Sequence, residues 1–146
     1  MNTCPAAEIE ALNLALAGEL QLIAAYDFGE ETHLLQPEAL ELARIYRCHH
    51  EQHAALLADA IRALGGTPIE APESYDFAGE GLSGEQDMLE LAARLEQRAA
   101  GSSLKALPRL PGHPAIANAA ASILGNDAMH HAVLQQALGG RPVFMA

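Results

Sequence analysis

The stretch RCHHEQHAALL, residues 47–57, places three histidines within five positions of a segment that otherwise has the composition of an apolar helix. A single histidine on an apolar helix face is usually a core or boundary residue, but three at spacing i, i+1 and i+4 favour a site. Imidazole is the commonest metal-ligand side chain, and His50 and His53 lie one turn apart on one helical face. The stretch therefore predicts a buried helix that presents ligands to a metal ion.

Proline and glycine divide the chain around this stretch into four long helical segments. Each segment has apolar residues at steps of three and four, as expected for one buried face. We expect Thr3 to cap the first helix, and Ser83 and Gln86 have the spacing of a capping box before the third. The predicted helices cover residues 5–33, 37–64, 84–107 and 114–138. The inward residues expected in the first helix are Ile9, Leu12, Leu16, Ile23 and Tyr26.

The connections between the helices predict the topology. Those between the first and second helices and between the third and fourth are short, so each pair forms an antiparallel hairpin. The stretch TPIEAPESYDFAGEGL, residues 67–82, is long enough to run the length of a bundle. We therefore expect a single all-α domain over residues 1–146, built as a four-helix bundle of two hairpins joined by one long crossover. The tail RPVFMA should pack Val143 and Phe144 on one end.

The composition agrees with this fold and indicates which classes of binding partner suit the protein. Half of the 146 residues are hydrophobic, only 4% are aromatic and tryptophan is absent, which favours helices. A net charge of −11 argues against nucleic acid and anionic membranes and suits cations. The two cysteines form no disulfide framework; Cys48 is either a soft ligand or, as we favour, an ordinary helix residue off the His50/His53 face. With no spanning apolar run and no signal-peptide pattern, we expect a cytoplasmic protein, or an exported one whose leader was removed.

Ionisable residues interrupt the inward face of all four predicted helices, and their spacing repeats. His50 and His53 follow Glu19 at i+31 and i+34, and Asp127 and His130 follow Glu96 at the same two steps. The two halves of the chain therefore match at an offset of 77, which also aligns Leu12 with Leu89 and Leu57 with Leu134. Two hairpins related by a pseudo-two-fold axis would bring all six side chains together. The predicted ligands are Glu19, His50, His53, Glu96, Asp127 and His130.

The energetics of burial indicate what such a cluster needs. An unpaired buried carboxylate costs roughly several kcal/mol or becomes protonated. Three carboxylates and three imidazoles facing one another are best explained by bound cations. The alternatives are that these groups only hydrogen-bond one another, or that helix rotation places some of them in solvent.

The chain resembles the ferritin-like superfamily, and within it the bacterial ferritin-like domain proteins, over about residues 5 to 140. The similarity lies in the segments LAGELQLIAAY, CHHEQHAALLADAI, LEQRAAGSSL and NDAMHHAVLQQAL, which contain the six predicted ligands. The resemblance implies a dinuclear centre with one Glu from each of two helices and a Glu-x-x-His pair from each of the others. It further implies divalent metal cofactors, iron foremost, and redox chemistry with oxygen or peroxide.

Two positions depart from this family pattern: His50 and Asp127 stand where glutamates are expected. Glu51 does not restore the pattern, because it lies about 100° round the helix from His50. At the other pair His131 could replace His130, although the register favours His130. Three carboxylates leave two divalent ions with one surplus positive charge, which disfavours a diferric state. Manganese, zinc or a single metal ion are therefore alternatives to a di-iron centre.

Three functions are compatible with these residues. The leading one is a di-metal oxidoreductase reacting with oxygen or peroxide, in which Tyr26 is either a relay or, as we favour, a core aromatic. The second is a bundle that binds metal without turnover and is stabilised by it. The third is a stress-associated structural bundle with a degenerate site. The sequence shows no nucleophile-elbow or phosphate-binding pattern, and a homodimer through a helix face is compatible with it.

Overall fold

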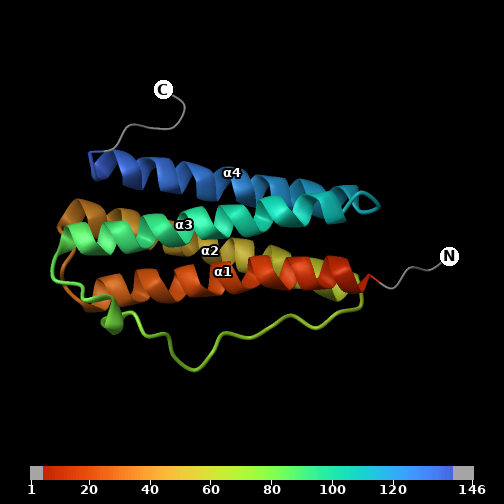
Figure 1. Cartoon of the computed structure of the whole chain (residues 1–146), viewed down its shortest axis with the longest axis horizontal. Helices are drawn as coiled ribbons and strands as arrows, with labels where there is room; N and C mark the ends of the chain where they lie inside the picture. The colour runs from red at the N-terminus through yellow and green to blue at the C-terminus, as the bar shows by residue number, and fades with distance from the viewer. Residues whose placement is uncertain (1–4, 140–146) are drawn as a thin grey trace.

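The computed structural model describes residues 5–139 and has the four-helix architecture expected from the sequence (Figure 1). The predicted all-α bundle is confirmed. Among the described residues, no helix is both long enough and apolar enough to pass through a membrane. The long helices are α1 (Ala6–Glu31), α2 (Pro37–Ala63), α3 (Glu85–Ala106) and α4 (Pro114–Ala137), and the short 3-10 helices are η1 (Ala78–Glu80) and η2 (Leu107–Arg109).

The chain forms two antiparallel hairpins, α1–α2 and α3–α4, which pack side by side (Figure 1). The crossover after α2 returns along the length of α1, so α3 starts at the end of the bundle where α2 starts. As a result α3 runs antiparallel to α1, and these two helices form the extensive contact between the hairpins. The contact between α2 and α4 is much smaller. The backbones of α2 and α4 therefore approach each other less closely than those of α1 and α3.

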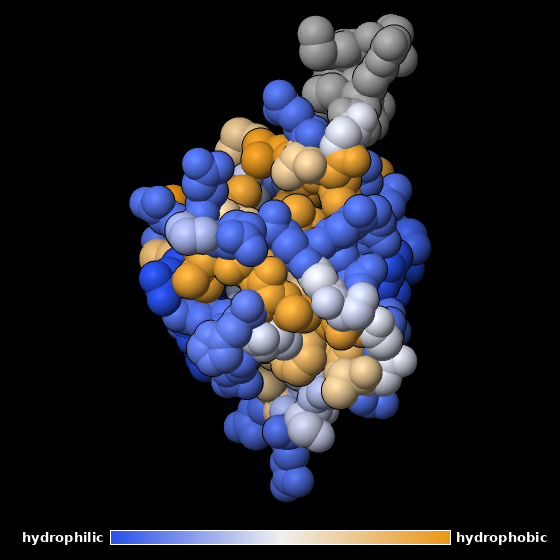
Figure 2. All heavy atoms as spheres, turned by 90° about the vertical axis from the view of Figure 1, so that its left-hand side faces the viewer, coloured by the Kyte–Doolittle hydropathy of each residue, from blue (hydrophilic) through white to orange (hydrophobic). Residues whose placement is uncertain are grey.

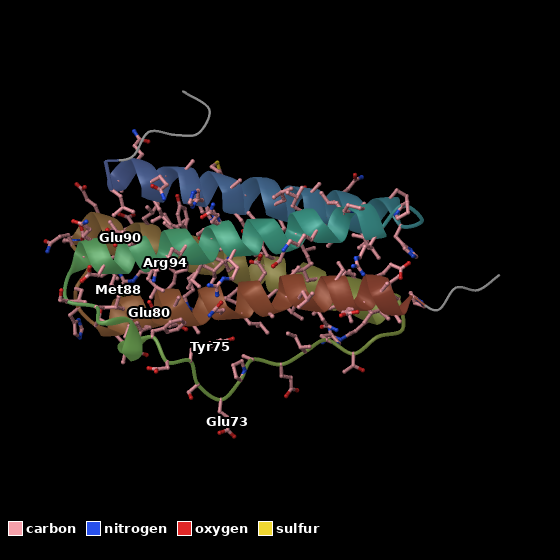
Figure 3. All side chains as sticks on the ribbon, viewed as in Figure 1. Glu73, Tyr75, Glu80, Met88, Glu90 and Arg94 are labelled. Atoms are coloured by element: carbon pink, nitrogen blue, oxygen red, sulfur yellow. The ribbon has the colours of Figure 1, made fainter. Side chains whose placement is uncertain are left out.

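The crossover is held against α1 and α3 by specific contacts. The amide of Asn13 in α1 donates to Thr67 O at 3.3 Å and accepts from Ile69 N at 2.9 Å. Further along, Phe77 is buried and its ring contacts those of Phe28 and Tyr75. Figure 3 labels Tyr75 and Glu73 on this segment, together with Glu80, whose carboxylate accepts a 2.9 Å hydrogen bond from Arg94 of α3. These contacts fix the crossover at both ends.

The predicted starts of α2 and α4 at Pro37 and Pro114 agree with the structure, and the other helix ends differ from the predictions by one or two residues. The Gly65-Gly66 pair ends α2 through a positive φ of 82° at Gly65 and a bond from Gly66 N to Ile61 O at 2.9 Å. This is a glycine-terminated Schellman end. A side chain at Gly66 would also collide with Ile9. Thr3, the expected cap of α1, and the tail residues Val143 and Phe144 lie outside the described residues.

The predicted capping box at the start of α3 is wrong. Gly84 occupies the cap position, so the third helical residue is Asp87 instead of Gln86. Asp87 Oδ2 accepts from the backbone and the hydroxyl of Ser83 at 2.8 and 2.9 Å, while Gln86 donates to Glu90. An acid such as Asp87 in the first turn of a helix is favoured because it meets unpaired N–H groups and the positive end of the dipole.

Two apolar clusters fill the bundle, and a polar layer separates them. One cluster centres on Leu22, Tyr46, Leu91 and Leu134, and the other on residues such as Leu12. In α1 the expected inward residue Ile23 is only half-buried, and its neighbour Leu22 is fully buried. The reason is that the face of α1 between α2 and α3 follows Glu19, Leu22 and Tyr26 at steps of three and four. The same three- and four-residue periodicity predicts further inward residues that the structure leaves half-buried: Ile9, Leu64, Leu89, Ala100, Ile116 and Leu138.

One end of the bundle exposes apolar surface. Figure 2 views this end and shows apolar atoms gathered in the middle with polar residues around them. A pocket at the first cluster is lined by Gly29, Leu35, Leu42 and Met88 among other apolar residues, and it reaches Tyr26 and Tyr46. The polar layer lies deeper in the bundle, beyond these two tyrosines.

Candidate metal centre

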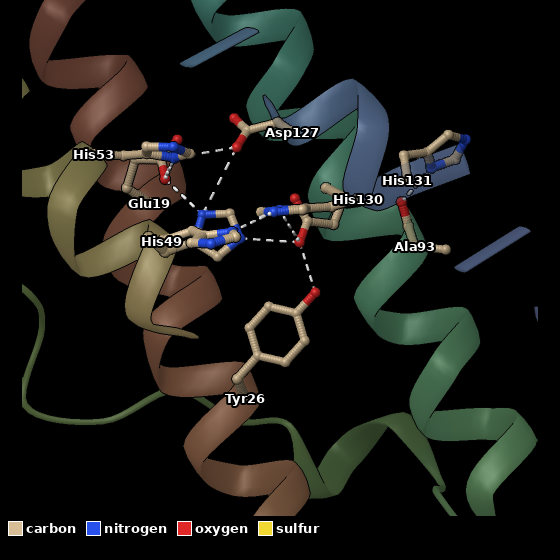
Figure 4. Close-up of polar contacts among 10 residues, drawn as sticks. Glu19, Tyr26, His49, His53, Ala93, Asp127, His130 and His131 are labelled. Carbon is tan, nitrogen blue, oxygen red and sulfur yellow. Dashed lines mark hydrogen bonds and ion pairs between the residues drawn. The ribbon is translucent and has the colours of Figure 1, made fainter. Parts of the chain in front are cut away.

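The structure brings all six predicted site residues into the polar layer between the two apolar clusters (Figure 4). Each helix supplies at least one of them, because the repeated spacing i+31 and i+34 places each ligand pair opposite the carboxylate of the preceding helix. Five of the six are fully buried, and the sixth, His53, has a side chain that is 9% exposed. The buried set is Glu19 from α1, His50 and His53 from α2, Glu96 from α3, and Asp127 and His130 from α4.

The side chains form two overlapping groups whose ligand atoms lie within 4.8 Å of one another. We call them half-site 1 (Glu19, His50, His53 and Asp127) and half-site 2 (His50, Glu96, Asp127 and His130). His50 and Asp127 belong to both. Carboxylates and imidazoles at this spacing are ligands for iron, manganese and zinc.

His50 lies between the two half-sites, with one ring nitrogen facing each. Its Nδ1 is 2.6 Å from Glu19 Oε2, and its Nε2 is 2.9 Å from Glu96 Oε1. The ring also stacks on Tyr26, with 5.7 Å between the ring centroids. The imidazole therefore lies between the two glutamates.

His53 and Asp127 complete half-site 1. His53 Nδ1 is 3.1 Å from Glu19 Oε2 and 3.3 Å from Asp127 Oδ1. Asp127 Oδ1 is also 3.7 Å from His50 Nδ1. In half-site 2, His130 Nδ1 is 3.3 Å from Glu96 Oε1.

Without metal, these contacts shift the ionisation of the site strongly. Burial lowers the pKa of His50, but hydrogen bonds to Glu19 and Glu96 outweigh it and raise the pKa to about 10. Burial likewise lowers the pKa of His53, and its contacts with Asp127 and Glu19 raise it to about 9. Burial raises the pKa of Glu19, but its two histidine partners bring it down to about 2. Burial, assisted by repulsion from Glu19, raises the pKa of Asp127 to about 7, although the 3.3 Å contact with His53 opposes it.

Several buried ligand atoms in the cluster still lack a hydrogen-bond partner among the described residues. They are Glu19 Oε1, Glu96 Oε2, both carboxylate oxygens of Asp127 and Nδ1 of His130. Unpaired buried polar atoms cost roughly 1–3 kcal/mol each, more when charged. Lone pairs that converge in one enclosed place are satisfied by a cation, so the residues present fit a bound divalent metal.

Two residues outside the predicted set support half-site 2. The Tyr26 hydroxyl donates to Glu96 Oε1 at 2.5 Å, and burial followed by the charge of Glu96 raises the pKa of Tyr26 well above its usual value. The phenol therefore keeps its proton and remains a donor. His49 Nδ1 lies 3.0 Å from His130 Nε2, and the two rings stack. Metal-binding histidines commonly engage their second nitrogen in this way, which fixes the ring.

His49 was not predicted as part of the site, although it stands in the stretch that first indicated it. One residue before His50, it lies about 100° round the helix from the face that His50 and His53 share. The signal available in the sequence was the repeat: the residue at offset 77 is Asn126, also polar and next to a predicted ligand.

The remaining candidates lie away from the cluster. His131 Nδ1 donates to Ala93 O at 2.9 Å, as Figure 4 shows, so its ring lies outside the cluster that contains His130. Glu51 is exposed and forms a 2.8 Å ion pair with Arg47. Cys48 is an exposed free cysteine, which agrees with the interpretation as an ordinary helix residue.

The comparisons with known proteins agree with this geometry. The family model described as ferritin-like domain matches residues 7–140. The chain belongs to the ferritin-like domain family. No curated protein matches it in sequence.

Solved structures similar to this chain share the fold at low identity. A ferritin-like diiron-carboxylate protein from Bacillus anthracis superposes with a TM-score of 0.82 at 22% identity, over 94% of this chain and 99% of the other. A conserved hypothetical protein from Mycobacterium tuberculosis gives 0.83 at 23% identity, over 97% and 96%. The bacterioferritin of Desulfovibrio desulfuricans, whose structure describes a diiron site in different catalytic states, gives 0.80 at 22% identity, over 92% and 80%.

Proposed function

We propose that this ferritin-like protein binds divalent metal ions, iron foremost, through Glu19, His50, His53, Glu96, Asp127 and His130, and that the centre reacts with oxygen or peroxide. The observation that supports this most is the convergence of unpaired buried carboxylate and imidazole atoms in one layer. Bound iron or manganese would supply electrons to the oxidant. The diiron sites named for two of the similar structures support iron as the first metal to test.

The protein's own residues provide what such a reaction needs. The apolar clusters on both sides exclude water from the layer and strengthen its electrostatic interactions. Half-site 1 borders a surface groove of about 360 Å³ in the α2/α4 seam, lined in part by His53, His49 and Asn126. This groove is the route by which ions and a small oxidant would reach the ligands. At the far side of the layer the Tyr26 hydroxyl, whose oxygen is 2.5 Å from Glu96 Oε1, holds a proton.

The test is to load the metal-free protein with ferrous iron under anaerobic conditions and then add oxygen or hydrogen peroxide. Oxidant consumption and the rise of ferric absorbance should follow, with one turnover per loaded centre at least. His130→Ala should abolish the reaction, whereas His131→Ala, which changes the adjacent histidine outside the site, should retain it.

Two other outcomes are informative. Tight metal binding with no oxidant consumption would show that the centre binds metal without turnover. Absence of metal binding under all conditions would refute the site and leave the structural bundle as the surviving alternative.

A further inference from the structure

The two halves of the chain have different residues at the equivalent position that both half-sites share. Asp127 and His50 are equivalent under the offset of 77, but they have different numbers of ligand lone pairs. A carboxylate has two oxygens and can bind two ions at once. A neutral imidazole has one lone pair and one N–H, so it can bind one ion and must donate a hydrogen bond on its other side.

The surroundings of His50 indicate which side keeps the proton. Nδ1 is closer to Glu19 Oε2, at 2.6 Å, than Nε2 is to Glu96 Oε1, at 2.9 Å. Glu96 Oε1 already accepts the Tyr26 hydroxyl. When a bound ion displaces one proton of the imidazole, Nδ1 therefore keeps its hydrogen bond to Glu19 and the Nε2 lone pair is directed into half-site 2.

The distribution of unpaired ligand atoms also favours half-site 2. In half-site 2, Glu96 Oε2 and His130 Nδ1 have no hydrogen-bond partner among the residues described, and His130 is oriented from behind by His49. In half-site 1, His50 and His53 both contact Glu19 Oε2, so that, apart from the shared Asp127, Glu19 Oε1 is the unpaired ligand atom among the residues described. Both oxygens of Asp127 are available to either side.

We propose that the two half-sites fill unequally: the first ion binds tightly in half-site 2 through Glu96, His130, Asp127 and His50 Nε2, and a second ion in half-site 1 binds at least about a hundredfold more weakly. The tautomer of His50 that serves the first ion places its N–H on Glu19. Filling one half-site thus withdraws a ligand from the other. This inference rests on the proposed function and specifies how its metal site is loaded.

The experiment is a titration of metal-free protein with manganese(II), followed by native mass spectrometry and electron paramagnetic resonance. Manganese avoids the exposed thiol of Cys48, which would compete for softer ions. We expect the singly loaded chain to dominate up to a large excess, with the six-line spectrum of an isolated ion. Glu96→Gln should remove the tight step, whereas Glu19→Gln should change it less than about threefold.

His50→Glu restores a carboxylate between the half-sites and should convert the titration to two ions of similar affinity. His131→Glu is the matched control, because it adds a carboxylate on α4 outside the cluster and should leave one tight step. If His50→Glu does not fold, the pair Glu96→Gln and Glu19→Gln still locates the first ion.

The outcomes separate this inference from the proposed function. Two ions of similar affinity in the unmodified protein, or a tight step lost with Glu19→Gln and kept with Glu96→Gln, would overturn the inference and leave metal binding intact. A chain that binds no ion would overturn the proposed function itself.

Discussion

The hairpins α1–α2 and α3–α4 place their ligands by the same spacing yet build unlike surroundings around them. The four ligands of half-site 2 are fully buried, with Tyr26 donating to Glu96 and His49, which also lines the α2/α4 groove, contacting His130. Half-site 1 borders the α2/α4 groove, and His53 reaches its surface. The positions equivalent to Tyr26 and His49 are Ser103 and Asn126, whose buried oxygens have no partner among the described residues. Equal spacing thus fixes where ligands meet, whereas neighbouring side chains decide how firmly each half is held.

The largest expected effect is metal-dependent stabilisation, which should depend on one half more than the other. At about a thousand times its Kd, an ion stabilises the native state by about 4 kcal/mol, equivalent to roughly 10 °C in Tm for a chain of this size. His130→Ala should lose nearly all of the shift seen with manganese, and His53→Ala should keep most of it. Differential scanning calorimetry with and without metal measures both. Equal losses would remove the distinction between the half-sites.

Apolar positions that match under the repeat should also differ in their contribution to stability. Leu12 is completely buried, whereas Leu89 is half-buried. Leu12→Ala should therefore lower the free energy of unfolding by about 3 kcal/mol, and Leu89→Ala by about 1 kcal/mol. Urea unfolding in the presence of a chelator measures these changes independently of the metal. A larger cost at Leu89 would contradict the described packing of α3.

The pH dependence of the stability of the metal-free protein tests whether His50 and His53 are protonated in the folded state. The folded-state pKa values of His50 and His53, about 10 and about 9, exceed the unfolded value of 6.5. Their stabilisation is therefore complete below pH 6.5 and is lost as the pH rises towards 10. Because each of the two histidines holds nearly one extra proton in the folded protein, we expect the free energy of unfolding to fall by roughly 2 kcal/mol per pH unit between pH 7 and 9.

Chemical denaturation at a series of pH values checks this slope. The folded-state pKa of Glu19, about 2, lies below the unfolded value of 4.5, so its stabilisation is lost as the pH falls from 4.5 towards 2. A flat profile between pH 7 and 9 would show that the imidazoles hold no extra protons in the folded protein.

The smallest effect concerns the hydroxyl groups at equivalent positions. Tyr26→Phe removes the donor to Glu96 and should weaken manganese binding about tenfold, because partners of metal ligands contribute to affinity on this scale. Ser103→Ala is the matched change in the other hairpin. It should leave affinity and stability nearly unchanged, since its hydroxyl contacts no partner among the described residues. Isothermal titration calorimetry compares the two variants, and equal effects would show that Tyr26 acts only through packing.

Much of the fold and the choice of clustered residues could be predicted from the chain alone. Pro37, Pro114 and the Gly65-Gly66 pair mark helix ends through backbone constraints that need no tertiary contact. The repeated i+31 and i+34 spacing could be recognised because helical periodicity fixes which side chains share a face. The start of α3 could not be placed correctly, because Ser83, Gln86 and Asp87 offer competing local bonds and only the backbone at Gly84 decides among them.

By itself, the sequence determined the number of helices, the hairpin topology and six ionisable side chains on inward faces, since these follow from local periodicity, connection length and the cost of burying charge. Only the tertiary structure decided that His50 stands between Glu19 and Glu96, that Tyr26 and His49 support one half, and that a groove opens onto the other. Those features depend on the rotation and separation of packed helices. Such quantities arise from the fit of distant side chains and are not encoded in the spacing within any one helix.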